Sequence, residues 1–130
     1  MNLIRKRIKR ATQAYDKLFH AVEKYVCEDM GVNNLSEMMA KLTQKTLETT
    51  NSTDKKEILW DVMCASGDYL AGIGIAAVKD DKECSEILAY MDDPIEFMHG
   101  VEAQVQVKAH QPENMKASEE LVDKYIKNRW

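Results

Sequence analysis

The residues best suited to chemistry in this sequence are three histidines, and their spacing predicts no shared site. His20, His99 and His110 lie on separate stretches, and none has a second histidine or a cysteine three or four residues away. Two metal ligands on one face of a helix need that spacing. We therefore expect three surface or boundary histidines, with no bound metal and no cofactor.

The cysteines are also dispersed. Cys27, Cys64 and Cys84 form no Cys-x-x-Cys pair and have no histidine in a zinc-binding arrangement. Free cysteines behave as small, partly buried apolar residues. We expect all three to lie on or near helix faces as reduced thiols, which fits a reducing compartment such as the cytoplasm.

The acidic pairs do not resemble a catalytic pair. Residues 80–81, 92–93 and 119–120 are adjacent acids, and adjacent side chains on a helix point about 100° apart. The sequence also lacks a Gly-x-Ser-x-Gly elbow and the repeated Glu-x-x-His pairs of di-iron bundles. These absences predict that the protein is not an enzyme and takes no small-molecule substrate.

The charge distribution singles out the first ten residues. They contain no acid and five cations, namely Arg5, Lys6, Arg7, Lys9 and Arg10. The remaining 120 residues carry 13 basic and 22 acidic residues, a net charge of −9. Because nucleic acid needs a broad cationic surface, this acidic body predicts no specific nucleic-acid partner.

The elements that must position these residues are helices. Apolar residues recur every three or four positions through residues 1–30, which predicts one long amphipathic helix. Its middle turns form a seam that we expect to pack against a partner helix, either of a second copy, as in a coiled-coil dimer, or of another helical protein. The seam consists of Ala11, Tyr15, Leu18 and Val22.

The start of that helix has two interpretations. The cations form a solvated helix face, or they lie over the phosphates of an anionic membrane with Leu3, Ile4 and Ile8 in the headgroup boundary. Each cation near such a surface contributes about 1 kcal/mol, enough together for weak peripheral attachment. The anionic-surface site is then Leu3, Ile4, Arg5, Lys6, Arg7, Ile8, Lys9 and Arg10.

Helix boundaries are marked by caps and turns. Gly31 is a natural C-cap for the first helix. Asn34 with Glu37 forms a capping box for a second helix that runs to about residue 48. The polar residues 49–53 predict an exposed loop, and Asp54 opens a third helix.

Two later features each leave two alternatives open. Gly72 and Gly74 cost the third helix about 1 kcal/mol each relative to alanine, so they mark either a close helix contact or a hinge. Asp93 and Pro94 either cap and begin a new helix, with Glu96 completing the box, or kink a longer one.

Two stretches of the sequence resemble the BAR domain family of the endophilin and amphiphysin type. They are residues 4–11, IRKRIKRA, and residues 85–98, SEILAYMDDPIEFM, which is similar to the Asp-Pro-Leu kink region of that family. The resemblance implies a crescent-shaped dimer of long kinked helices with a basic N-terminal segment that folds on curved membranes. The chain departs from the family in its early breaks near residues 31 and 49 and in its acidic body.

The predicted fold is all-α, with residues 1–130 forming one antiparallel bundle of four to six helices behind a long basic first helix. No run of 18 apolar residues predicts a membrane span. The predicted function is a non-enzymatic helical scaffold that associates with itself or with another helical protein. The alternative is a cytoplasmic, membrane-peripheral protein that uses its basic start on anionic lipid.

Overall fold

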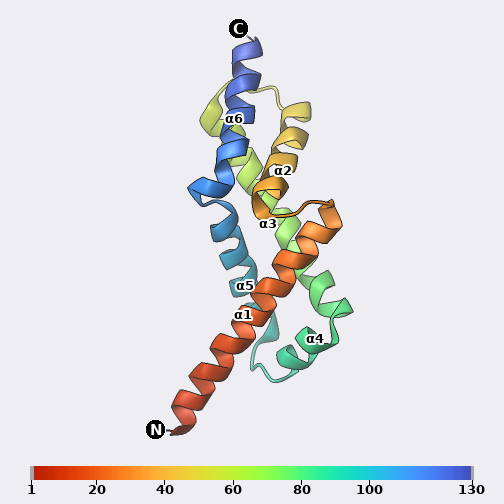
Figure 1. Ribbon diagram of the computed structural model, residues 1–130, viewed down its shortest axis with the longest axis vertical. Helices are drawn as coiled ribbons and strands as arrows, with labels where there is room; N and C mark the ends of the chain where they lie inside the picture. The colour runs from red at the N-terminus through yellow and green to blue at the C-terminus, as the bar shows by residue number, and fades with distance from the viewer. Residues whose placement is uncertain (1, 130) are drawn as a thin grey trace.

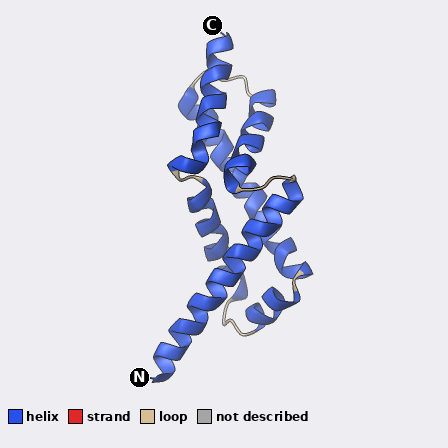
Figure 2. Ribbon diagram, in the orientation of Figure 1, coloured by secondary structure: helices blue, strands red, loops and turns tan. Residues whose placement is uncertain are grey.

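A computed structural model describes residues 2–129, apart from the side chains of Asn2, Arg7, Ile8, Arg10 and Ala11. Every regular element in this described part is a helix, which confirms the all-α class (Figure 2). The helices are α1 (Asn2–Met30), α2 (Leu35–Thr49), α3 (Lys55–Asp80), α4 (Lys82–Ala89), α5 (Pro94–Ala109) and α6 (Pro112–Arg129).

The predicted capping residues lie at the end of α1 and at the start of α2. Gly31 has a φ of +67°, a left-handed conformation that suits glycine at a helix C-terminus. The Asn34 side chain accepts a hydrogen bond of 2.9 Å from the N–H of Glu37. The Glu37 carboxylate accepts one of 2.8 Å from the N–H of Asn33, one residue earlier than a standard capping box.

Asp93 and Pro94 begin a new helix. The Asp93 side chain accepts a hydrogen bond of 3.0 Å from the N–H of Glu96, and Pro94 occupies the first turn of α5. Because Pro94 has no N–H to donate, this position costs no hydrogen bond. Residues 82–109 therefore form two helices, α4 and α5, and the kinked-helix alternative is wrong.

The molecule is elongated, and α1 crosses α3 obliquely (Figure 1). The central helix is α3, which contacts each of the other helices. The chain turns at residues 31–34 and 110–111 redirect it without reversing it, so α1 continues into α2 and α5 continues into α6. The short helix α4 follows directly on α3 and packs near its C-terminal end.

This arrangement corrects the simple antiparallel bundle. Tyr15 contacts Gly100 while Glu23 contacts Lys108, so α1 and α5 run parallel. In contrast, Ser66 contacts His110, and Glu102 lies over Gly74, so α3 and α5 run antiparallel. The antiparallel prediction assumed that the chain reverses direction at every turn between helices. The turns at residues 31–34 and 110–111 change its direction without reversing it.

The core runs the length of α3 and draws on every helix. Its fully buried large side chains include Leu18 and Val22 of α1, Met38 and Met39 of α2, and Leu70 of α3. Close packing of such side chains supplies the main favourable free energy of a domain of this size. The long helices therefore hold fixed positions relative to one another wherever they cross α3.

Gly72 and Gly74 of α3 occupy different surroundings. The helix runs unbroken through both, so the hinge alternative is wrong. Gly74 is buried beneath the side chain of Glu102, whereas Gly72 is exposed and faces open space. The packing explanation therefore holds for Gly74 only.

Candidate functional site

The start of α1 projects beyond the rest of the protein. Leu3 is 76% exposed and Ile4 is 65% exposed, and among the described side chains of the helix the first buried one is Ala14. Residues 3 and 14 are separated by about 17 Å of helix, at 1.5 Å per residue. We call residues 3–10 the basic tip (Figure 1).

Cations surround the two exposed apolar side chains of the basic tip. Arg5, Lys6 and Lys9 are exposed and form no ion pair with another described side chain. The side chains of Arg7, Ile8 and Arg10, which the sequence also assigned to this surface, lie outside the described part. The basic tip thus combines two features of a docking surface, uncovered apolar area and unpaired charge.

The seam that follows the basic tip is occupied by the protein's own helices. Leu18 and Val22 are fully buried in the core, and the side chain of Ala11 lies outside the described part. Tyr15 donates a hydrogen bond of 2.8 Å to the carbonyl oxygen of Gly100. Its ring packs edge-on against Phe97, with 5.8 Å between ring centroids. From Tyr15 onward, the helix–helix packing described here is intramolecular.

The segment that connects α3, α4 and α5 is strongly acidic. Residues 80–96 contain seven acids and one lysine, a net charge of −6. We call this segment the acidic corner. Its Glu83 forms an ion pair with Lys17 of α1, and its Asp80 accepts a hydrogen bond from the hydroxyl of Tyr25. These contacts hold the acidic corner against the middle of α1.

Part of the acidic corner remains uncovered. Glu86, Asp92 and Glu96 are exposed and form no ion pair with other described residues. Tyr90 is 88% exposed and Ile95 is 72% exposed. The corner therefore presents apolar area among unpaired negative charge, the electrostatic opposite of the basic tip.

The three histidines lie apart, as their spacing predicted. His20 is exposed beside Phe19, and His99 is exposed with its Nδ1 3.7 Å from Oε2 of Glu102. His110 lies 3.0 Å from the hydroxyl of Ser66, and burial lowers its pKa from the usual 6.5. The half-buried His110 fits the boundary position expected for it.

Glu102 is a buried acid that the sequence analysis missed. Burial raises the pKa of its carboxyl, and the nearby His99 lowers it to a smaller extent. The sequence did carry a signal, because Glu102 shares the helical spacing of Met98, Val105 and Ala109. A carboxyl group on an apolar helix face indicates either a polar group that pairs with it or a neighbouring helix against which its side chain must pack.

Cys27 and Cys84 show no sign of an activated thiol. Cys84 is buried, and burial raises its pKa to about 11. Burial also raises the pKa of Cys27, whereas Cys64 lies exposed on α3. A raised pKa suppresses the thiolate, which is the reactive form of cysteine.

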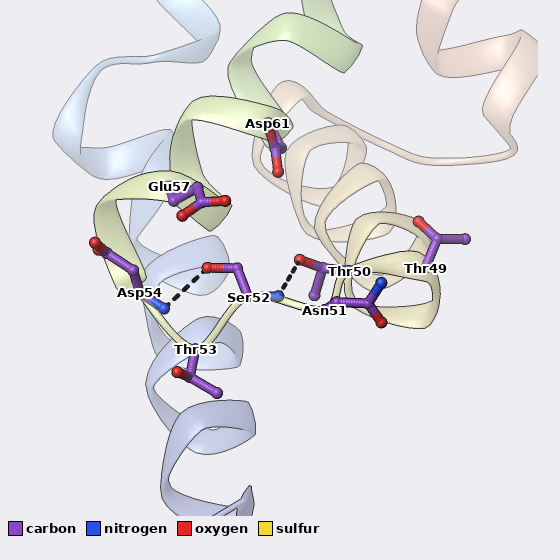
Figure 3. A pocket seen from close by; sticks show the side chains of 8 residues that line it. All are labelled: Thr49, Thr50, Asn51, Ser52, Thr53, Asp54, Glu57 and Asp61. Atoms are coloured by element: carbon purple, nitrogen blue, oxygen red, sulfur yellow. Dashed lines mark hydrogen bonds between the residues drawn. The ribbon is translucent and has the colours of Figure 1, made fainter.

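Two surface hollows were considered as ligand sites. One is a polar, open hollow at the loop between α2 and α3, lined by hydroxyl, amide and carboxylate groups (Figure 3). Its backbone is held by side-chain hydrogen bonds from the N–H of Ser52 to Thr50 and from the N–H of Asp54 to Ser52. The other is a more apolar hollow that includes Leu59, His110 and Met115. Neither gathers a set of converging catalytic groups.

The helix α3 is long and apolar enough to cross a membrane, judged by length and composition alone. The sequence analysis did not expect such a segment. Its buried residues, among them Ile58, Val62 and Leu70, pack in the core, and the core helix of a folded domain has the same composition. We therefore interpret α3 as the central packing helix.

In the described part of the chain, no three histidine, cysteine or acidic side chains converge as metal ligands would. The basic tip and the acidic corner are thus the surfaces whose chemistry calls for an explanation. In comparisons with known protein families, curated proteins and solved structures, nothing matches this chain.

Proposed function

We propose that this protein is a non-enzymatic, cytoplasmic helical scaffold that associates with helical partners, including a second copy of itself, through the basic tip of α1. The observation that supports the proposal is the exposure of Leu3 and Ile4 on a helix whose first buried side chain, among those described, is Ala14, about 17 Å further along. A lone helix of this length is only marginally stable in water. A partner surface would offset that cost by covering its apolar side chains.

Sedimentation velocity over a concentration series into the high micromolar range tests the proposal. We expect concentration-dependent association for the full chain, weakened when Leu3 and Ile4 are both replaced by Ser. The matched control replaces Ile75 and Val107, which are 72% and 57% exposed on α3 and α5, by Ser. A strict monomer throughout, or equal effects of the two double variants, would contradict association through the basic tip.

Peripheral binding to an anionic membrane is the second candidate, favoured by the combination of exposed leucine and isoleucine with unpaired cations on the basic tip. The resemblance to BAR domains gives the same expectation. On this hypothesis the apolar side chains enter the headgroup boundary while Arg5, Lys6 and Lys9 approach lipid phosphates. The attachment would be reversible and sensitive to salt.

Co-sedimentation with vesicles of phosphatidylserine and phosphatidylcholine tests the membrane hypothesis. Replacing Arg5, Lys6 and Lys9 by Ser is expected to release the protein from the vesicles. The matched control replaces three exposed lysines of α6 by Ser, namely Lys116, Lys124 and Lys127. Equal vesicle binding by both triple variants would end the hypothesis.

A further inference from the structure

We propose that the basic tip of one copy docks on the acidic corner of a second copy, so that two chains pair reciprocally. This inference rests on the proposed self-association and specifies its interface. The two surfaces are opposite in charge: +5 over residues 1–10 and −6 over residues 80–96. Each also carries two exposed large apolar side chains, Leu3 and Ile4 on the tip, and Tyr90 and Ile95 on the corner.

The geometry of α1 keeps the basic tip away from most of the corner of its own chain. Tyr15 is anchored on Phe97 and Gly100, and α1 runs parallel to α5. From these contacts α1 continues for 11 residues to Ile4, whereas α5 begins only three residues before Phe97, at Pro94. At 1.5 Å per residue, α1 extends about 17 Å from Tyr15 to Ile4, whereas α5 extends only about 5 Å from Phe97 to Pro94.

The same geometry suits a pair related by a two-fold axis. Both the overhanging tip and the acidic corner lie at the end of the molecule where α1 begins (Figure 1). Two copies that place their α1 helices side by side in opposite directions would set each tip beside the corner of the other. A two-fold interface uses the same surface on both copies, so one chain needs only one tip and one corner.

The acidic corner also favours a second copy over a lipid bilayer as occupant. A membrane that attracts the cations of the tip is anionic. The acidic corner lies at the same end of the molecule as the tip (Figure 1), and its exposed Glu86, Asp92 and Glu96 would be repelled by such a membrane. On a second copy, the same acids become the partners of Arg5, Lys6 and Lys9.

A charge-swap experiment tests the pairing. In the tip variant, Arg5, Lys6 and Lys9 are each replaced by Glu. In the corner variant, Glu86, Asp92 and Glu96 are each replaced by Lys. We expect each variant alone to associate at least about tenfold more weakly than the unmodified chain. The net charge of residues 1–10 changes from +5 to −1 in the tip variant, and that of residues 80–96 changes from −6 to 0 in the corner variant, so the attraction between tip and corner is lost. An equimolar mixture of the two variants should restore the dimer as a heterodimer, because one contact keeps its original charges and the other places the new glutamates beside the new lysines.

The readout is sedimentation velocity, with one of the two variants carrying a fluorescent label at Cys64. Circular dichroism checks that each variant is folded, and acids in the first turns of α1 favour the helix through its dipole. The control variant replaces three exposed acids on α2 and α6 by Lys, namely Glu48, Glu113 and Glu120. Control and unmodified chain should associate equally.

The possible failures separate the interface from the proposed function. If the chain self-associates but the corner variant matches the control, the scaffold proposal stands and the acidic corner is the wrong surface. If both variants lose association and their mixture does not regain it, the tip does not contact the corner. A monomer at all concentrations overturns both proposals, and vesicle binding by that monomer would identify the tip as a lipid-binding surface.

Discussion

The side chain of Glu102 fills the space that a β-carbon on Gly74 would occupy. Such a carbon would lie 1.7 Å from Oε1 of Glu102 and 2.6 Å from its Cδ. Real β-carbons do not approach other atoms so closely, so glycine at this position allows an acid of α5 to lie flat on α3. The contact also keeps the carboxylate away from water, which explains the raised pKa of Glu102.

Gly72 and Gly74 of α3 should respond differently to alanine. Gly72→Ala is expected to raise the free energy of unfolding by about 1 kcal/mol, because it faces open space and alanine favours the helix. Gly74→Ala is expected to raise it by less, because the flexible side chain of Glu102 must be displaced by the new β-carbon. Urea unfolding measures both, and equal effects of the two changes would show that Glu102 imposes no constraint. In a Glu102→Ala background the two glycine changes should have equal effects.

Glu102 should make the protein less stable as the pH rises. An unfolded chain releases this proton near pH 4.5, whereas the folded chain holds it to a higher pH. Between these two values the folded state binds more protons, so the free energy of unfolding falls with increasing pH. Glu102→Gln cannot ionise and should be more stable than the unmodified chain at pH 7 but not at pH 4. Thermal unfolding at the two pH values tests this, and a constant difference would contradict it.

His110 should have the opposite effect. Burial lowers its pKa below 6.5, so the unfolded chain binds the proton more readily than the folded one. Stability is therefore expected to fall as the pH drops below about 6.5 through the lowered value. His110→Gln should flatten this part of the curve of unfolding free energy against pH. An unchanged slope in the variant would place the responsible group elsewhere.

Ser118 of α6 has a buried hydroxyl without a hydrogen-bond partner. Such a group loses its hydration on folding with no compensating bond. Ser118→Ala is expected to raise the free energy of unfolding by about 1 kcal/mol. The matched control is Ser66→Ala, whose fully buried hydroxyl bonds to Met63 and to His110 and should cost about 1 kcal/mol. Chemical denaturation distinguishes the two, and a loss for Ser118→Ala would refute the unsatisfied hydroxyl.

The helices and most of their ends could be predicted because their causes are local. The left-handed Gly31, the capping side chains of Asn34 and Asp93 and the first-turn Pro94 act within a few residues of themselves. The same holds for the charge of the basic tip, which depends on residue types alone. The projection of that tip could not be predicted, because it depends on where α5 begins beside Tyr15.

The sequence by itself determined that this chain is helical, where its first helices begin and end, and that cations gather at one end while acids dominate the rest. Only the tertiary structure decided that α1 and α5 run parallel, that Glu102 is buried on Gly74, and that Leu3 and Ile4 remain uncovered. The reason is physical: caps and periodicity act over one or two turns of a helix. The contact of Tyr15 with Gly100, by contrast, joins residues 85 positions apart.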